Sequence, residues 1–124
     1  MPMKIPCEVV VKDILPMIRK ELSVILVKEY GLPQSTVARR LDITDAAVSQ
    51  YLRSKRGSSI DCSVYPQYGG LMDELRKSAE IIFSDGDVFS ELCCLCEYVK
   101  RSGLLAEVYR DQTGFMPKCT EPDD

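Results

Sequence analysis

Apolar residues recur every three to four positions between Glu8 and Tyr30, which predicts an amphipathic helix over this stretch. The stripe consists of Val10, Ile14, Ile18, Leu22 and Ile25. Pro16 falls inside it, so we expect a kink or a break near Leu15. Further apolar residues lie off the stripe, at Val9, Val11, Met17, Val24 and Val27. Because this leaves little polar surface, we expect the helix to pack against a second subunit.

The pattern after the turn "GLP" predicts two short helices, over Gln34–Leu41 and 45–54, with Thr44 as the N-terminal cap of the second. A small residue where two helices cross, with apolar residues around it, allows a close pair of this kind. The residues that would close such a pair are Val37, Ala38, Leu41, Ile43, Val48 and Leu52.

The C-terminal half continues the helical pattern after a stretch without period, 58–68, which reads as a linker or loop. We predict helices over 70–82, 88–102 and 104–110, with Ser and Asp of the turn "SDGD" capping the second. Nothing indicates strand pairs, so the predicted fold is all-α. We divide it into 1–57, with the helix pair, and 58–124, a helical dimerisation or sensor part, and expect one compact unit.

Length and charge narrow the classes of protein that fit. A chain of 124 residues is the usual size of one domain, and no apolar run near 18 residues is present to span a membrane. The first residues lack the pattern of a secretory signal, so we expect a cytoplasmic protein. Residues 1–57 carry a net charge of +4 and residues 58–124 a net charge of −7. A basic half suits a polyanion, and an acidic half should face away from it.

The helix pair in the basic half is the most specific signal in the chain. Its second helix leaves small and polar residues facing out, a set suited to base edges in a major groove. These are Thr44, Asp45, Ala46, Ser49, Gln50 and Arg53, while Gln34, Ser35, Lys55 and Arg56 are placed to hold phosphates at the ends of the two helices. Arg39 and Arg40 on the first helix read as solvated surface or phosphate neighbours.

The stretch "QSTVARRLDITDAAVSQYLRSKRG" resembles a helix-turn-helix of the phage-repressor-like (XRE) class. With "PCEVVVKDILPMIRKEL" before it and an "LCxLC"-like segment after it, the chain looks like a group of small archaeal predicted transcriptional regulators. The resemblance implies a helix-turn-helix bundle with additional C-terminal helices, a cytoplasmic DNA-binding regulator and a homodimer. Many such motifs hold glycine in the turn where this chain has Asp42. Aspartate is among the better replacements, because it tolerates a left-handed backbone.

Six cysteines and no histidine need an explanation in a chain assigned to the cytoplasm, where disulfides are rare. Cys93 and Cys96, three apart on a predicted helix, share one face and match metal-ligand spacing. Cys7 and Cys119 could complete a four-thiolate site for zinc or for an iron–sulfur cluster. Thiol redox sensing without metal and plain packing stay open. Cys94 points elsewhere, toward solvent or a second subunit.

These observations favour a sequence-specific regulator that binds double-stranded DNA as a homodimer, responsive to redox state or metal through its cysteines. We expect no enzymatic activity, because histidine and a glycine-rich phosphate loop are missing and Cys93 lies well inside its helix. Two alternatives remain: a protein-interaction module resembling an antitoxin, and a small metal-binding protein. The operator, the regulated genes and the effector are not encoded in any recognisable pattern.

Overall fold

The computed structural model describes residues 6–53 and 62–114, and these residues form helices and connecting turns without a strand. The elements are α1 (Pro6–Val9), η1 (Val10–Ile14), α2 (Leu15–Lys28), α3 (Gln34–Leu41), α4 (Asp45–Arg53), η2 (Cys62–Val64), α5 (Tyr68–Phe83), α6 (Val88–Arg101) and α7 (Leu104–Thr113). The all-α prediction is confirmed. The predicted limits are close, although α5 begins two residues before Gly70 and α7 continues to Thr113.

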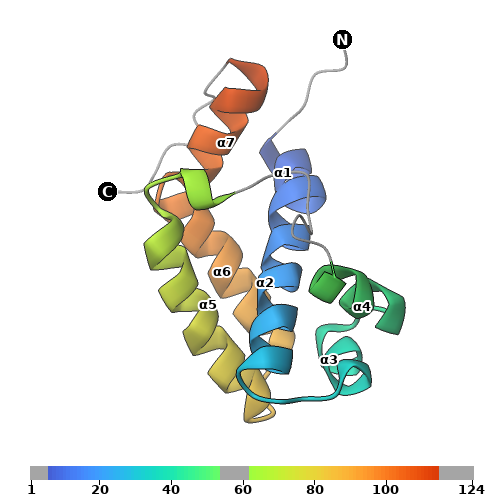
Figure 1. Cartoon of the computed structure of the whole chain (residues 1–124). Helices are drawn as coiled ribbons and strands as arrows, with labels where there is room; N and C mark the ends of the chain where they lie inside the picture. The colour runs from blue at the N-terminus through green and yellow to red at the C-terminus, as the bar shows by residue number, and fades with distance from the viewer. Residues whose placement is uncertain (1–5, 54–61, 115–124) are drawn as a thin grey trace.

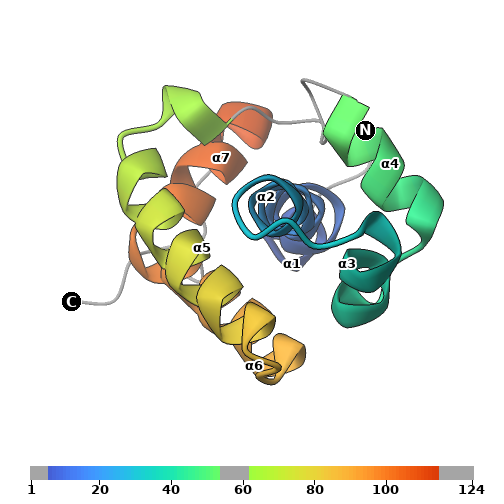
Figure 2. The ribbon, with the colours of Figure 1, turned by 60° about the horizontal axis from the view of Figure 1, so that its bottom comes forward.

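Helix α2 lies at the centre of the fold. It packs against α3 and α4 on one side and against α5 and α6 on the other, while α1 lies beside α7 (Figures 1 and 2). One cluster of buried side chains therefore runs through both halves of the chain, from Val9 to Tyr109. The apolar surface that led us to expect a second subunit against the N-terminal helix is largely covered by the chain itself. Val11 is the exception, with 62% of its surface exposed.

Pro16 does not break the helix. The preceding segment η1 is π-helical, and the Leu15 N–H donates to the Val10 carbonyl five residues back. The widened turn places Pro16 in the first turn of α2, where a residue without an N–H leaves no hydrogen bond unmade. The expected distortion is thus a change of helical type, and the helix continues through it.

The stretch 58–68, expected to be irregular, contains a short 3₁₀ helix, η2, over its described part. Cys62 at its start is buried in the core. The Tyr65 hydroxyl donates to Asp111 of α7 at 2.7 Å. Burial, and after it the hydrogen bond to Asp111, raises the pKa of the Tyr65 phenol. This hydrogen bond anchors the segment to α7. The anchored segment in turn positions the start of α5. None of the helices in the described ranges has the length and apolar character that crossing a bilayer requires.

Candidate nucleic-acid interface and cysteine helix

The turn between α3 and α4 is closed by a left-handed residue. Asp42 has φ 57° and ψ 46°, the conformation that glycine adopts most easily. The Ile43 N–H donates to Ala38 at 2.9 Å, and the Asp42 N–H donates to Arg39 at 3.3 Å. This is the Schellman arrangement, which satisfies the last carbonyls of α3. Asp42 therefore occupies the left-handed position at which many such motifs have glycine.

Helix α4 begins directly after this turn, with Thr44 as its cap. The Ala47 N–H donates to the Thr44 hydroxyl at 3.0 Å, and the Val48 N–H donates to the Thr44 carbonyl at 3.2 Å. The predicted cap is confirmed. A capped start fixes the direction in which α4 leaves the turn, and so fixes which of its residues face outward.

The inner side of the pair is built as predicted. Val37, Ala38, Leu41 and Val48 are buried, and Ile43 and Leu52 are partly buried against them. These side chains meet α2, which places α3 and α4 together on one side of the central helix (Figure 2). The opposite side of the pair has no other described element over it.

That outer side carries the residues assigned to DNA. Five of the six positions expected to face bases are exposed and Ser49 is half-buried: Thr44, Asp45, Ala46, Gln50 and Arg53. Gln34 and Ser35, in the first turn of α3, are exposed as well. Lys55 and Arg56 lie outside the described residues. Eight of the ten residues predicted to contact DNA thus lie on α3, on α4 and at the turn between them, on one side of α2 (Figure 2).

Arg40 has a different role from the one that its position suggested. Its guanidinium Nη1 donates to the carbonyl of Ile82 at 2.6 Å and to that of Phe83 at 2.9 Å, both in the last turn of α5. A cation is favourable there, because the carbonyl end of a helix carries partial negative charge. The phenyl ring of Phe83 in turn stacks on Tyr30, with centroids 4.7 Å apart. Arg40 is therefore a link between the helix pair and α5, and only Arg39 remains a solvated arginine.

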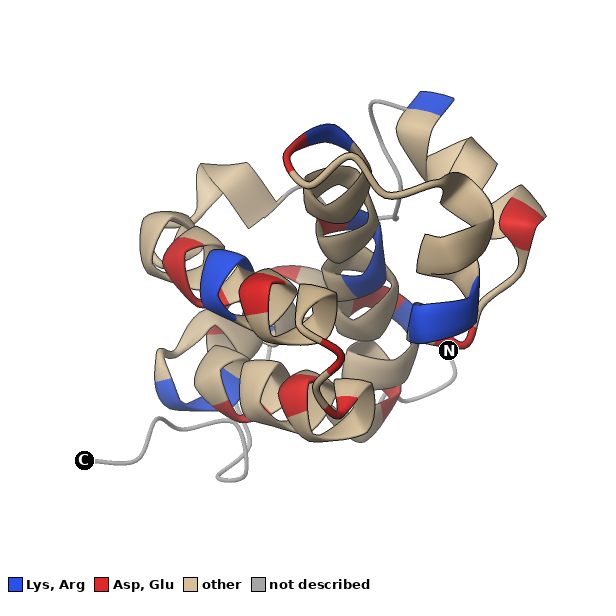
Figure 3. Cartoon of the chain, turned by 90° about the horizontal axis from the view of Figure 1, so that it is seen from below, with Lys and Arg blue, Asp and Glu red and all other residues tan. Residues whose placement is uncertain are grey.

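The charges on the outer side of the pair nearly cancel. Arg39 and Arg53 are exposed there, and so are Asp42 and Asp45. Lys55 and Arg56, which follow α4 in the sequence, supply two of the four net positive charges of residues 1–57. Acidic segments lie along α5 and α6, on the other side of α2 from α4 (Figure 3), although the turn that joins them starts next to the Ile82 and Phe83 carbonyls that bind Arg40 of α3. An anionic partner at α4 would meet little repulsion from them.

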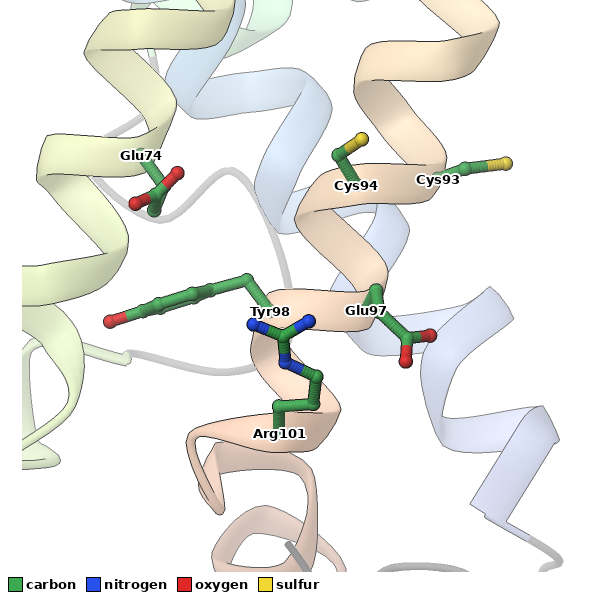
Figure 4. Close-up of a pocket in the computed structure, with 6 residues that line it drawn as sticks. All are labelled: Glu74, Cys93, Cys94, Glu97, Tyr98 and Arg101. Carbon is green, nitrogen blue, oxygen red and sulfur yellow. The ribbon is translucent and has the colours of Figure 1, made fainter. Parts of the chain in front are cut away.

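Helix α6 presents its cysteines on two sides. Its N-terminus is capped by Asp87, which accepts from Phe89 N–H at 3.1 Å and from the Ser90 hydroxyl at 2.8 Å. The Ser90 hydrogen bond, and after it the Phe89 N–H, lowers the pKa of the Asp87 carboxyl. Cys93 and Cys94 are exposed and their side chains point in different directions (Figure 4). Cys94 belongs to an open hollow of about 490 Å³ between α5 and α6, which is also lined by Glu74, Cys93, Glu97, Tyr98 and Arg101.

Cys96 is half-buried beside Cys93. Burial, and after it the charge of Cys93, raises the pKa of the Cys96 thiol to about 11, while the Arg19 guanidinium on α2 lowers it. Arg19 itself has a buried Nε without a hydrogen-bond partner among the described residues. No sequence pattern indicates that Arg19 lies near Cys96, because the two residues belong to helices α2 and α6, which are far apart along the chain.

The described part of the chain does not bring Cys7 together with Cys93 and Cys96. Over residues 6–53 and 62–114, no three His, Cys, Asp or Glu side chains lie together where they could hold a metal ion. Cys7 is exposed in α1, beside α7, and does not join Cys93 and Cys96. Cys119 lies outside the described residues. Of the four cysteines, the described residues therefore keep together the pair on α6.

The fold and site together define an all-helical protein with an exposed, capped helix pair and a cysteine-bearing helix on opposite sides of a central helix. Comparisons with protein-family models, with curated proteins and with solved structures find no match for this chain. Its function is therefore argued from its own geometry.

Proposed function

We propose that the protein is a transcription regulator that binds double-stranded DNA as a homodimer through α3 and α4. The observation that carries the proposal is the outer face of α4. It is exposed, it bears small and hydrogen-bonding side chains such as Ala46 and Gln50, and its direction is fixed by the Asp42 turn and the Thr44 cap. A helix of this kind can enter a major groove with its first turns against the base edges.

In this proposal α3 crosses the DNA backbone. Gln34 and Ser35 at its exposed N-terminus are placed to donate to a phosphate, and Arg39 adds a positive charge one turn further on. Lys55 and Arg56 would follow the end of α4 along the backbone. A dimer presents two α4 helices about 34 Å apart, one turn of DNA. The cysteine helix α6, on the other side of α2, would influence DNA only through the arrangement of the two subunits.

The test starts from a pool of random duplex DNA, selected for binding and then measured by fluorescence anisotropy at several salt concentrations. We expect an inverted-repeat site, and a log–log salt slope that falls by roughly 0.9 for each phosphate contact removed, as in Lys55→Ala or Arg56→Ala. Gln50→Ala should relax sequence preference and leave the slope unchanged. A selected pool without a shared sequence, together with a flat salt dependence, would refute the proposal.

The near-neutral described surface of the pair favours a second candidate, a protein-interaction module that resembles an antitoxin. Asp42 and Asp45 beside Arg39 and Arg53 suit a mixed-charge protein partner as well as DNA. This candidate predicts weak, salt-insensitive DNA binding and a stoichiometric complex with one partner protein from the host cell. Replacement of Gln50 and Arg53 would then abolish that complex.

A further inference from the structure

A second stripe runs along α6, beside the one that faces the core. It consists of Phe89, Cys93, Cys96 and Lys100, and successive members are separated by four, three and four residues. Residues at this spacing lie on one side of a helix. Phe89 is 60% exposed, Cys93 is exposed, and Cys96 and Lys100 are half-buried. The stripe is thus on the surface, and it places two thiols side by side at its centre.

The separations of four, three and four residues are the same whether the stripe is followed from its N-terminal or its C-terminal end. A second copy of α6 that runs antiparallel to the first would set Cys93 opposite Cys96 of the second copy, and Phe89 opposite Lys100 of the second copy. A 4-3-4 spacing is that of the seam between two helices in a coiled coil. Small residues in the middle of such a seam allow the helix axes to approach to about 8 Å. The Lys100 ammonium and the Phe89 ring at each end are a favourable pair, because a cation is attracted to an aromatic face.

We propose that two copies of the chain pair antiparallel through this stripe and bind one zinc ion with Cys93 and Cys96 of both copies. Four thiolates in a tetrahedron are a preferred zinc site, with zinc–sulfur distances of about 2.3 Å. Among the described residues, one chain brings only these two thiols together, and no third ligand lies near them. In this proposal the second copy supplies the other two thiolates. Binding converts four thiols and Zn²⁺ into a four-thiolate complex of charge 2− and releases four protons.

The surroundings of the stripe suit a complex of that charge. Arg19 of α2 acts electrostatically on Cys96, and its Nε is buried without a hydrogen-bond partner among the described residues. A guanidinium N–H that donates to metal-bound sulfur orients and stabilises it, and Arg19 has such an N–H without a partner among the described residues. Two copies bring two Arg19 guanidinium groups, whose two positive charges offset the 2− charge of the complex. Cys94 lies outside the 4-3-4 spacing of the stripe and takes no part in the proposed site.

This inference shares with the proposed function only the assumption of a dimer, and it does not need DNA. The experiment uses the full chain, reduced and stripped of metal under anaerobic conditions and then titrated with zinc chloride alone. Zinc content and mass in solution are measured together, by a colorimetric zinc assay and by light scattering after size-exclusion chromatography. We expect one zinc per two chains, and a dimer that forms as zinc is added.

Variants separate the ligands from their neighbours. Cys93→Ser and Cys96→Ser should each abolish both zinc binding and zinc-dependent dimerisation, because each removes two of the four ligands. Cys94→Ser is the matched control, and it should keep both. Phe89→Asp retains every thiol but spoils the seam, so we expect its zinc affinity to fall by roughly tenfold or more. Circular dichroism checks that each variant keeps its helices.

Several results would overturn the site. One zinc per chain that is lost in Cys7→Ser or Cys119→Ser would indicate the single-chain site instead. Full zinc binding by Cys93→Ser, or by a monomeric Phe89→Asp, would exclude the shared site, and so would the absence of any zinc binding. DNA binding is scored separately with the zinc-loaded protein. A zinc dimer without DNA binding would leave this site standing and refute only the regulator.

Discussion

Two adjacent arginines in α3 should behave in opposite ways when each is replaced by alanine. Arg40 binds two carbonyls of α5, whereas Arg39 is exposed without such a partner in the contacts described above. Arg40→Ala should therefore lower the free energy of unfolding, and Arg39→Ala should change it little. Arg39 is a close control, because it has the same side chain, in the same helix, one position away.

The magnitude follows from the two hydrogen bonds. A charged donor typically contributes about 1.5–3 kcal/mol to a buried hydrogen bond. Here the bond to Phe83 is exposed, and the Ile82 carbonyl also accepts from Asp85 N–H at 3.1 Å, so neither carbonyl is left without a partner in the variant. The loss should therefore lie near the lower end, at about 1–1.5 kcal/mol for Arg40→Ala. Arg39→Ala should stay within about 0.5 kcal/mol of the parent protein.

Urea denaturation followed by circular dichroism measures both values, and thermal unfolding should show Arg40→Ala lower by about 3–6 °C. Arg40→Lys should recover part of the loss, because an ammonium can reach one carbonyl but lacks the planar fork. The same proteins are then compared in DNA binding, where Arg39→Ala should reduce the salt slope and Arg40→Ala should leave it unchanged. Equal destabilisation by both alanine variants, or a reduced slope for Arg40→Ala alone, would refute the assignment of Arg40 to α5.

Three further predictions concern single positions. Gly69→Ala should stabilise α5 by about 0.5–1 kcal/mol, whereas Gly70→Ala should stabilise less or destabilise, because its new Cβ would overlap the Tyr98 hydroxyl; in a Tyr98→Phe background the gain should return in urea denaturation. Thr44→Ala should cost about 1 kcal/mol by the same measurement, with Thr44→Ser as the control that keeps the cap. The lowered pKa of the Asp87 carboxyl means that its stabilising effect is present above the usual value of 3.8 and is lost as pH falls through the lowered pKa. Asp87→Asn should therefore unfold at lower temperature than the parent protein at pH 7, and a difference that persists undiminished at the most acid pH would contradict this linkage.

The helices and the turn between α3 and α4 could be predicted because their causes are local. Burial of one helix face imposes a period of three to four residues, and this period located every long helix. Thr44 and Asp87 cap the helices that follow them, through hydrogen bonds that span only two or three residues. Asp42 could be expected in a left-handed conformation because a short polar side chain tolerates it.

The errors come from contacts between distant parts of the chain. Arg40 meets carbonyls 42 and 43 residues away, and backbone carbonyls leave no mark in a sequence. The expectation of a second subunit against the N-terminal helix rests on the amount of apolar surface alone, and nothing in the sequence pattern indicates how much of that surface the chain covers itself. That surface is covered from two sides, by α3 and α4 and by α5 and α6, and which elements cover it is a property of topology.

The cysteines also show that a sequence pattern locates neighbours on one helix but does not locate partners from distant parts of the chain. Spacing along α6 placed Cys93 and Cys96 on one side of the helix, and Cys93 does contribute to raising the pKa of the Cys96 thiol. Spacing did not predict that Cys94 lines a hollow together with Cys93. The addition of Cys7 rested on the number of ligands that a metal needs, and α1 holds Cys7 away from Cys93 and Cys96. If four ligands are needed and one chain provides two on a symmetric stripe, symmetry supplies the other two, as it does in many homodimers. The requirement for a dimer at α4, to span one turn of DNA, and the requirement at α6, to complete the thiolate set, would then be met by a single two-fold axis. Cross-linking of the two copies through Cys93 and measurement of the selected DNA half-site spacing would test whether both requirements are met by the same dimer.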